Sequence, residues 1–305
     1  MAVKTVQAII NGQTYSLTYN SSSGKYEATI SAPSTSSYNQ SNHYYNVTVK
    51  ATDTAGNVTT KDSTDSSLGS SLKLTVKEKV APTIAITSPG ASAKLITNTP
   101  TITFQLRDAD SGVNISSLAL KIDGGSAIGN AAAGMTYTAV SGGYNCTYVV
   151  QSALTDGTHT VTVNVNDNDG NTASQASVSF TVDTVAPTLN VTAPASGLIT
   201  NVAAQNVVGT TSDATSSPVT VAIKLNGTDQ GSVTVDSSGN FTKAITLASG
   251  SNTIIIRATD AAGKYTEVTR AVTLDTVAPT ISAVTLTPNP VDAGATYIIS
   301  VTVSD

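Results

Sequence analysis

The chain has 305 residues, of which 39% are hydrophobic and only 11% are charged, and its formal net charge is −5. This composition excludes a disordered chain, which combines low hydrophobicity with high charge, and the acidic balance excludes a nucleic-acid-binding protein, which needs clustered Lys and Arg. The single cysteine, Cys146, has no second cysteine in the chain with which to form an internal disulfide.

The first block of the chain, residues 1–79, alternates apolar and polar residues between short turn sequences. Residues 6–10 lead into Asn11-Gly12, and alternation continues on both sides of a Ser- and Gly-rich turn at 20–24, with Tyr26, Ala28 and Ile30 after it. Period-two alternation bounded by Gly, Asn and Ser predicts β-hairpins.

Blocks two and three repeat this plan with two strands added at the front. Each block has an Asx-Gly turn early, at Asp123-Gly124 and Asn226-Gly227, and an Asp-x-x-Gly turn late, at 167–170 and 260–263. Asn, Asp and Gly tolerate the left-handed backbone that tight strand-to-strand turns require. About seven short strands per block predict an immunoglobulin-like sandwich.

A Val-Ala-Pro-Thr phrase separates the blocks and recurs at 80–83, 185–188 and 277–280. Proline disfavours helix at the residue before it, so each phrase predicts an extended joint. The predicted fold is all-β: an elongated rod of tandem immunoglobulin-like sandwiches. Its expected parts are a domain at 1–79 without its first two strands, complete domains at 80–184 and 185–276, and a partial domain at 277–305.

The first and last blocks are out of phase, because the first lacks the two strands that the last one has. The final strand alternates Tyr297, Ile299, Val301 and Val303 with small polar residues. We therefore expect donor-strand complementation, in which residues 277–305 of one subunit complete the first block of another and subunits join head to tail. Two alternatives stay open: the sequence is cut from a longer array, or the first block folds alone as a reduced sandwich.

The motifs carry a resemblance to a known family. The joints, residues 51–57 and 258–263, and the ending 288–297 resemble bacterial immunoglobulin-like repeat domains, as found on phage and prophage tail proteins of Gram-positive bacteria. The resemblance implies a non-enzymatic structural or host-surface-contacting role without catalytic residues. The expected location is the virion or extracellular space, reached by cell lysis, because no signal peptide is visible. Expected partners are other copies, virion proteins or a host surface, with no nucleic acid and no membrane span.

The candidate sites are few. His43 and His159 lie in separate blocks, and neither a Gly-x-Ser-x-Gly elbow nor a His/Cys metal cluster is present in the sequence. No cofactor is expected unless closely spaced carboxylates bind calcium, which takes six to eight oxygen ligands. The alternative for these carboxylates is ordinary turn chemistry. The calcium candidates are Asp108, Asp110, Asp167, Asp169 and Asp183.

A second candidate site is the loop at 34–43, where Tyr38, Tyr44 and Tyr45 gather. Exposed aromatic rings would make this loop a binding site for a host glycan or protein, and the chain an adhesin module. Tyr45, at the start of a strand, has the competing interpretation of a sandwich corner residue. An enzyme's accessory array is a third interpretation of the whole chain.

Overall fold

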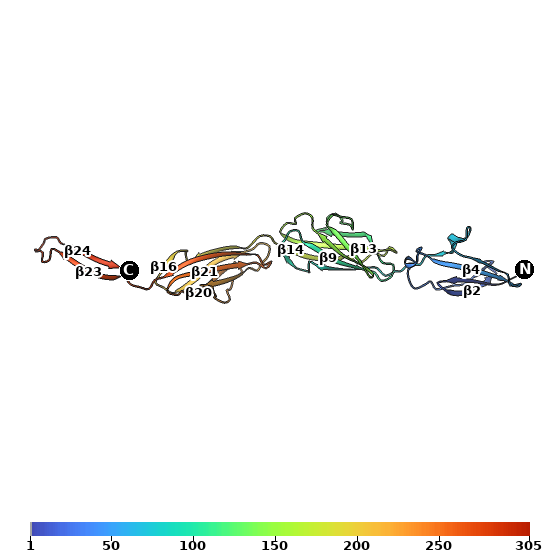
Figure 1. The fold of residues 1–305 in the computed structure, drawn as a ribbon, viewed down its shortest axis with the longest axis horizontal. Coiled ribbons are helices and arrows are strands. Elements are labelled where there is room, and N and C mark those ends of the chain that lie inside the picture. The colour runs from blue at the N-terminus through green and yellow to red at the C-terminus, as the bar shows by residue number, and fades with distance from the viewer. Residues whose placement is uncertain (1) are drawn as a thin grey trace. The chain divides into compact units, whose positions relative to one another are not determined.

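The computed structural model describes residues 2–305, which form β-strands and two short 3₁₀ helices, η1 (Ser37–Asn39) and η2 (Gly69–Leu72), with no α-helix among them (Figure 1). The predicted all-β class is therefore confirmed. None of these residues belongs to a helix that is long and apolar enough to cross a membrane. The chain divides into two compact units, of which the first ends at Val182 and the second begins at Asp183.

The first unit begins with a single sheet, here called block one, in the order β3-β2-β1-β4-β5, with β6 pairing to β4. Its buried hydrophobic residues are Ala8, Ile10 and Tyr45, and no second layer covers the sheet among the described residues. Block one thus has little apolar core. Its strands are β1 (Val3–Ile10), β2 (Gln13–Asn20), β3 (Lys25–Glu27), β4 (Tyr45–Asp53), β5 (Val58–Lys61) and β6 (Lys73–Leu74).

The first unit continues with a complete sandwich of two four-stranded sheets, β10-β13-β14-β8 and β11-β12-β9-β7. Alternate residues of the central strands, such as Phe104, Leu120, Val163 and Phe180, point inward and are almost fully buried. Period-two alternation places these side chains on one face of each sheet. The strands are β7 (Thr83–Ser88), β8 (Lys94–Leu95), β9 (Thr101–Arg107), β10 (Val113–Ile122), β11 (Met135–Val140), β12 (Gly143–Val149), β13 (Gly157–Asp167) and β14 (Ala176–Val182).

The second unit contains a sandwich of a three-stranded sheet, β15-β17-β20, and a five-stranded sheet, β16-β22-β21-β18-β19. Its core is built in the same way around Val207, Ile223, Phe241 and Ile254. The strands are β15 (Thr188–Ala193), β16 (Leu198–Thr200), β17 (Ala204–Ser212), β18 (Thr220–Leu225), β19 (Thr228–Asp229), β20 (Asn240–Thr246), β21 (Gly250–Thr259) and β22 (Tyr265–Leu274).

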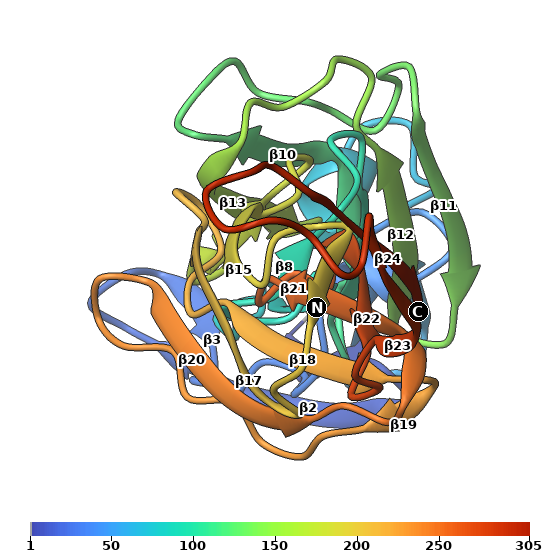
Figure 2. The same ribbon diagram turned by 90° about the vertical axis from the view of Figure 1, so that its left-hand side faces the viewer.

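The second unit ends in a two-stranded antiparallel hairpin of β23 (Thr280–Thr287) and β24 (Ile298–Ser304), labelled in Figures 1 and 2. Every residue of both strands is exposed. Two-stranded hairpins are marginally stable in water, because neither face is covered.

The early Asx-Gly turns are present in all three blocks. Asn11, Asp123 and Asn226 have φ of 47°, 52° and 50°, and the glycine after each also has a positive φ. This backbone is the one for which Asn-Gly and Asp-Gly are selected in tight hairpins. One detail of block one differs from the prediction: β3 stops at Glu27, so residues 28–30 are not strand. In the described part of the chain, the outer edge of β3 has no neighbouring strand that would extend its pairing.

Candidate functional site

The hairpin presents one apolar face. In its register Ile281 lies opposite Val303, Val284 opposite Val301, and Leu286 opposite Ile299. Residues directly opposite each other on antiparallel strands share a face. These six side chains are 42–63% exposed, so they form a continuous apolar surface in water. Contiguous apolar patches of this kind mark interaction sites.

The predicted donor residues Ile299, Val301 and Val303 lie on this face of β24, and Tyr297 immediately precedes the strand, 49% exposed. The opposite face of the hairpin is mostly polar, with Ser300 opposite Thr285 and Thr302 opposite Ala283. The hairpin is therefore amphipathic across its thickness.

Block one has a free edge at the corresponding place. In the first complete sandwich, β12 comes before the long strand β13 and pairs with β9. In the second complete sandwich, β20 comes before the long strand β21 and pairs with β17. In block one that position belongs to β3, which pairs with β2 on one side and has no partner strand on the other among residues 2–305. The unpaired backbone of an edge strand is a template for strand addition.

Three carboxylates of the second unit converge at one end of its sandwich. Ligand oxygens of Asp183, Asp213 and Asp260 lie within 4.8 Å of one another. They come from the joint, from the residue after β17 and from the residue after β21. Asp183 is 0% and Asp260 is 5% exposed.

One oxygen of each carboxylate stabilises its own loop. Oδ1 of Asp260 accepts hydrogen bonds from the backbone N–H of residues 262–264, Oδ1 of Asp213 from Thr215 and Ser216, and Oδ1 of Asp183 from Val185. The second oxygens, Oδ2 of Asp183 and of Asp260, are buried and have no hydrogen-bond partner in the described part of the chain, and neither has the Ser216 hydroxyl.

A related cluster lies at the same end of the preceding sandwich, in the first unit. Glu78, Asp108 and Asp167 place their ligand oxygens within 4.8 Å of one another. Burial raises the pKa of Glu78, and the nearby charges of Asp108 and Asp110 add to the rise, against hydrogen bonding from Ser111. Here both oxygens of Asp167 accept hydrogen bonds from Asn171.

Asp110 and Asp169, which were also predicted to bind calcium, accept hydrogen bonds from block one. Asp110 accepts hydrogen bonds from the Ser36 N–H and the Asn39 amide, and Asp169 accepts one from the Glu78 N–H. Of the five predicted calcium ligands, the structure thus gathers Asp108 with Asp167, and Asp183 separately. Asp110 and Asp169 tie block one to the sandwich that follows it.

One ring of the tyrosine loop is exposed to solvent. Tyr38 is 37% exposed and stacks on His43, with 4.2 Å between ring centroids. Tyr44 lies under the ammonium group of Lys73. Tyr45 is 3% exposed, and its hydroxyl donates a hydrogen bond to the Thr35 carbonyl, so it cannot offer a stacking surface.

His159 is buried in a polar pair at the start of β13. Its Nδ1 lies 2.7 Å from a carboxylate oxygen of Asp123, and its Nε2 lies 2.7 Å from the Thr155 carbonyl. Both neighbours are acceptors, so both ring nitrogens must donate, which only the imidazolium can do. Burial alone would lower the pKa of His159, but these two hydrogen bonds outweigh it and the pKa is raised.

The third block holds the same pair in a form that cannot titrate. Asn252 occupies the place of His159 and accepts a hydrogen bond from the amide of Asn226, which occupies the place of Asp123. The next residue along the strand also contacts the turn in both blocks. The backbone N–H of Thr160 donates a hydrogen bond to the Asp123 carboxylate, and the backbone N–H of Thr253 donates one to the side-chain oxygen of Asn226. The role of His159 is therefore to anchor a turn at the start of β13.

The comparisons with known proteins agree with this fold. Residues 76–184 match the family model of the bacterial Ig-like domain, and residues 187–276 match that of glucodextranase domain B. The two sandwiches are immunoglobulin-like repeat domains. Domains of this kind are typically non-catalytic. Among curated proteins, none matches this chain.

Solved structures give distant likenesses. The fibronectin(III)-like modules of CbhA from Clostridium thermocellum are 17% identical over 63% of this chain and 94% of that chain, with a TM-score of 0.38. Sidekick-1 immunoglobulin domains 1–4 are 11% identical over 89% and 67%, with a TM-score of 0.35. Latent PorU from Porphyromonas gingivalis is 15% identical over 89% of this chain and 29% of its own, with a TM-score of 0.30. These TM-scores are low, and no functional argument rests on them.

The sequence analysis missed Glu78, Asp213 and Asp260. A positional signal was available, because Glu78 and Asp183 both stand four residues before the proline of a joint. Asp108 and Asp213 each directly follow the second strand of a block, and each has a serine three residues later. Aligning the blocks repeat by repeat would have shown that these acidic residues occupy equivalent positions in the two sandwiches.

Proposed function

We propose that this chain is a non-enzymatic structural protein of a phage virion, a tail-fibre component that assembles head to tail by donor-strand complementation. The β23–β24 hairpin of one copy completes block one of the next. β24 adds to the free edge of β3, and the apolar face of the hairpin covers the uncovered sheet. The virion assignment is supported by the resemblance of the joints and repeats to phage tail domains.

The observation that carries the assembly proposal is the pairing of two complementary defects. A six-residue apolar face is exposed on the hairpin, and block one is a sheet without a second layer. In the complete sandwiches the strands equivalent to β23 and β24 are β7 and β9, or β15 and β17, and they form the layer that block one lacks. A heterologous contact of this type propagates into a fibre unless it closes into a ring.

The test compares residues 1–305 with residues 1–277 by sedimentation velocity over a range of concentrations, with electron microscopy of the largest species. We expect concentration-dependent oligomers for the longer chain and a monomer for the shorter one. If both chains still sediment as monomers when their concentration is raised about 100-fold, strand donation between copies is wrong. The chain would then be a spacer or an adhesin module.

A further inference from the structure

The carboxylates of Asp183, Asp213 and Asp260 form a built acidic site in the second unit, and the structure gives it no internal counter-charge. Two of the three are almost fully buried, and each of those two has one oxygen without a hydrogen-bond partner. Burying ionised carboxylates beside one another without compensation is strongly unfavourable. Proteins normally resolve such a cluster with a bound cation or a paired basic side chain.

No basic side chain serves here. The nearest candidate by sequence is Lys264, whose ammonium group donates a hydrogen bond to the Thr184 carbonyl. Ion pairs of the described residues join Lys61 to Asp65, His159 to Asp123 and Arg257 to Glu267, and none of these carboxylates belongs to the cluster. The Lys264 ammonium group thus lies next to Asp183 but leaves the buried Oδ2 atoms of Asp183 and Asp260 without a hydrogen-bond partner.

We propose that Asp183, Asp213 and Asp260 bind a calcium ion. All the donor atoms are oxygens: three carboxylates, two of them with a free buried oxygen, and the unpartnered Ser216 hydroxyl nearby. Hard oxygen ligands of this kind suit calcium, whereas zinc and copper sites use histidine or cysteine. Calcium also tolerates the irregular geometry of three separate loops and fills its remaining positions with water and backbone carbonyls.

The division of labour within each carboxylate supports this assignment. Oδ1 is consumed by backbone N–H groups of its own loop, which fixes the orientation of the side chain. Oδ2 of Asp183 and Asp260 is then left for an external ligand. Loops that hold their ligands in place before binding lose less entropy when the ion arrives.

The corresponding cluster of the first unit provides a contrast. There the residue four positions after the late-turn aspartate is Asn171, and its amide occupies Oδ2 of Asp167. In the second unit the same position is Lys264, which donates only its backbone N–H to Asp260 and leaves Oδ2 free. The proposal is therefore made for the second unit alone.

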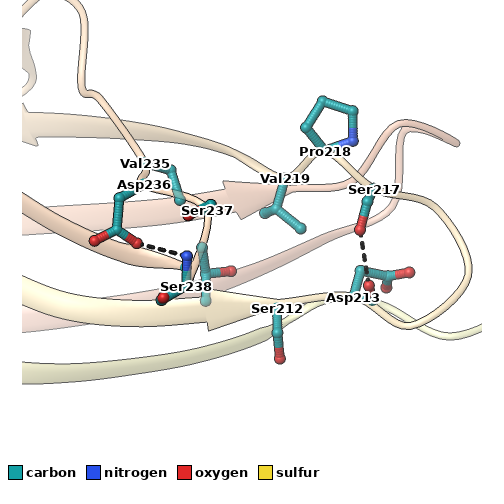
Figure 3. A pocket seen from close by; sticks show the side chains of 11 residues that line it. Ser212, Asp213, Ser217, Pro218, Val219, Val235, Asp236, Ser237 and Ser238 are labelled. Atoms are coloured by element: carbon teal, nitrogen blue, oxygen red, sulfur yellow. Dashed lines mark hydrogen bonds between the residues drawn. The ribbon is translucent and has the colours of Figure 1, made fainter.

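Of the three carboxylates, Asp213 also lines a pocket of about 390 Å³ in the same sandwich (Figure 3). The pocket lies between the loop that follows β17 and the turn at 236–239, and beside it the Ser217 hydroxyl donates a hydrogen bond to the backbone carbonyl of Asp213. Asp213 is also the least buried of the three carboxylates.

The test is isothermal titration of calcium chloride into the full chain after chelator treatment, together with differential scanning calorimetry in EDTA and in calcium. We compare the wild type with Asp260→Asn, and use Asp236→Asn as the matched control. Asp236 caps a turn of the same sandwich through the same kind of hydrogen bonds but belongs to no cluster. Magnesium chloride and sodium chloride at equal ionic strength serve as ion controls.

We expect calcium to raise the melting temperature of the second unit by about 10 °C at 100-fold excess over Kd. Asp260→Asn should lose one equivalent of bound calcium and that shift. In EDTA the same variant should melt at or above the wild type, because a buried charge is removed while the asparagine oxygen still accepts the turn hydrogen bonds. Asp236→Asn should behave as the wild type in calcium binding.

A wild type without calcium heat and without a melting shift overturns the proposal. So does a shift that Asp260→Asn retains, or one that sodium chloride reproduces, because the effect would then be binding elsewhere or screening of the net charge. A purely structural role for Asp260 is recognised by a loss of stability that is the same in EDTA and in calcium. That outcome also contradicts the proposal.

Discussion

Replacing Val301 by aspartate tests the apolar face of the hairpin directly. Val301 lies opposite Val284 at the centre of that face and is 48% exposed. Because the six side chains of the face are about half exposed, covering them gains about 5–9 kcal/mol in gross transfer free energy. Association costs of about 4–15 kcal/mol oppose this gain, so the backbone hydrogen bonds of strand addition are also needed for micromolar association.

The variant removes about 1 kcal/mol of apolar burial and places a carboxylate against the partner sheet, which costs a further 2 kcal/mol or more. We expect association to weaken about 100-fold. Thr302→Asp is the matched control, because it adds the same charge on the opposite face of the same strand. The assay is sedimentation velocity, with calorimetry to show that the sandwich of the second unit melts as in the wild type.

Equal association of the two variants would refute the reasoning, whether both bind as the wild type or both fail to bind. In the first case the apolar face is not an interface. In the second, charge on the hairpin in general opposes association, and the exposed apolar side chains of the face have no special role.

Three further predictions concern the sandwich of the first unit. The raised pKa of His159 stabilises the fold below the unfolded-state value of about 6.5, and this stabilisation is lost as pH rises through the folded pKa. The lowered pKa of Asp123, where hydrogen bonding from His159 and Thr160 overcomes the effect of burial, acts in the opposite direction and is lost in acid. The melting temperature of the wild type should therefore fall between pH 5 and pH 9, and the double variant His159→Asn, Asp123→Asn should abolish this fall. A double variant whose melting temperature falls with pH as the wild type's does would contradict the pairing. Phe104→Ala should cost about 3–5 kcal/mol in chemical denaturation, because its side chain is 1% exposed, while the transition of the second unit stays where it was. Cys146 is buried, and burial raises the pKa of its thiol to about 11, so a thiol reagent should label the native chain far more slowly than the unfolded chain. Rapid labelling of the native chain would show that the sheet opens locally.

The strands and turns of this protein could be predicted because their causes are local. Alternation in Ile102, Phe104 and Leu106 decides which face of β9 is buried, and Asp123-Gly124 decides where β10 turns back. Where a strand depends on its neighbour, local information fails. Alternation runs on to Ile30, but β3 ends at Glu27 at an edge without a partner.

The candidate sites show the same division. The apolar face of β24 could be predicted from the sequence, since a two-residue period assigns Ile299, Val301 and Val303 to one face. For Tyr45 the sequence left two interpretations, a ring exposed for ligand binding and a corner residue of the sandwich, and the fold decides between them by burying the side chain.

The sequence by itself determined the class of fold, the repeated blocks and their extended joints, because alternation, Asx-Gly turns and proline act over a few residues. Only the tertiary structure decided which carboxylates meet. Asp213 follows β17 and Asp260 follows β21, two strands of different sheets, and the packing of those sheets brings both to Asp183 at the joint. Long-range convergence of this kind depends on how layers pack, and no local pattern encodes it.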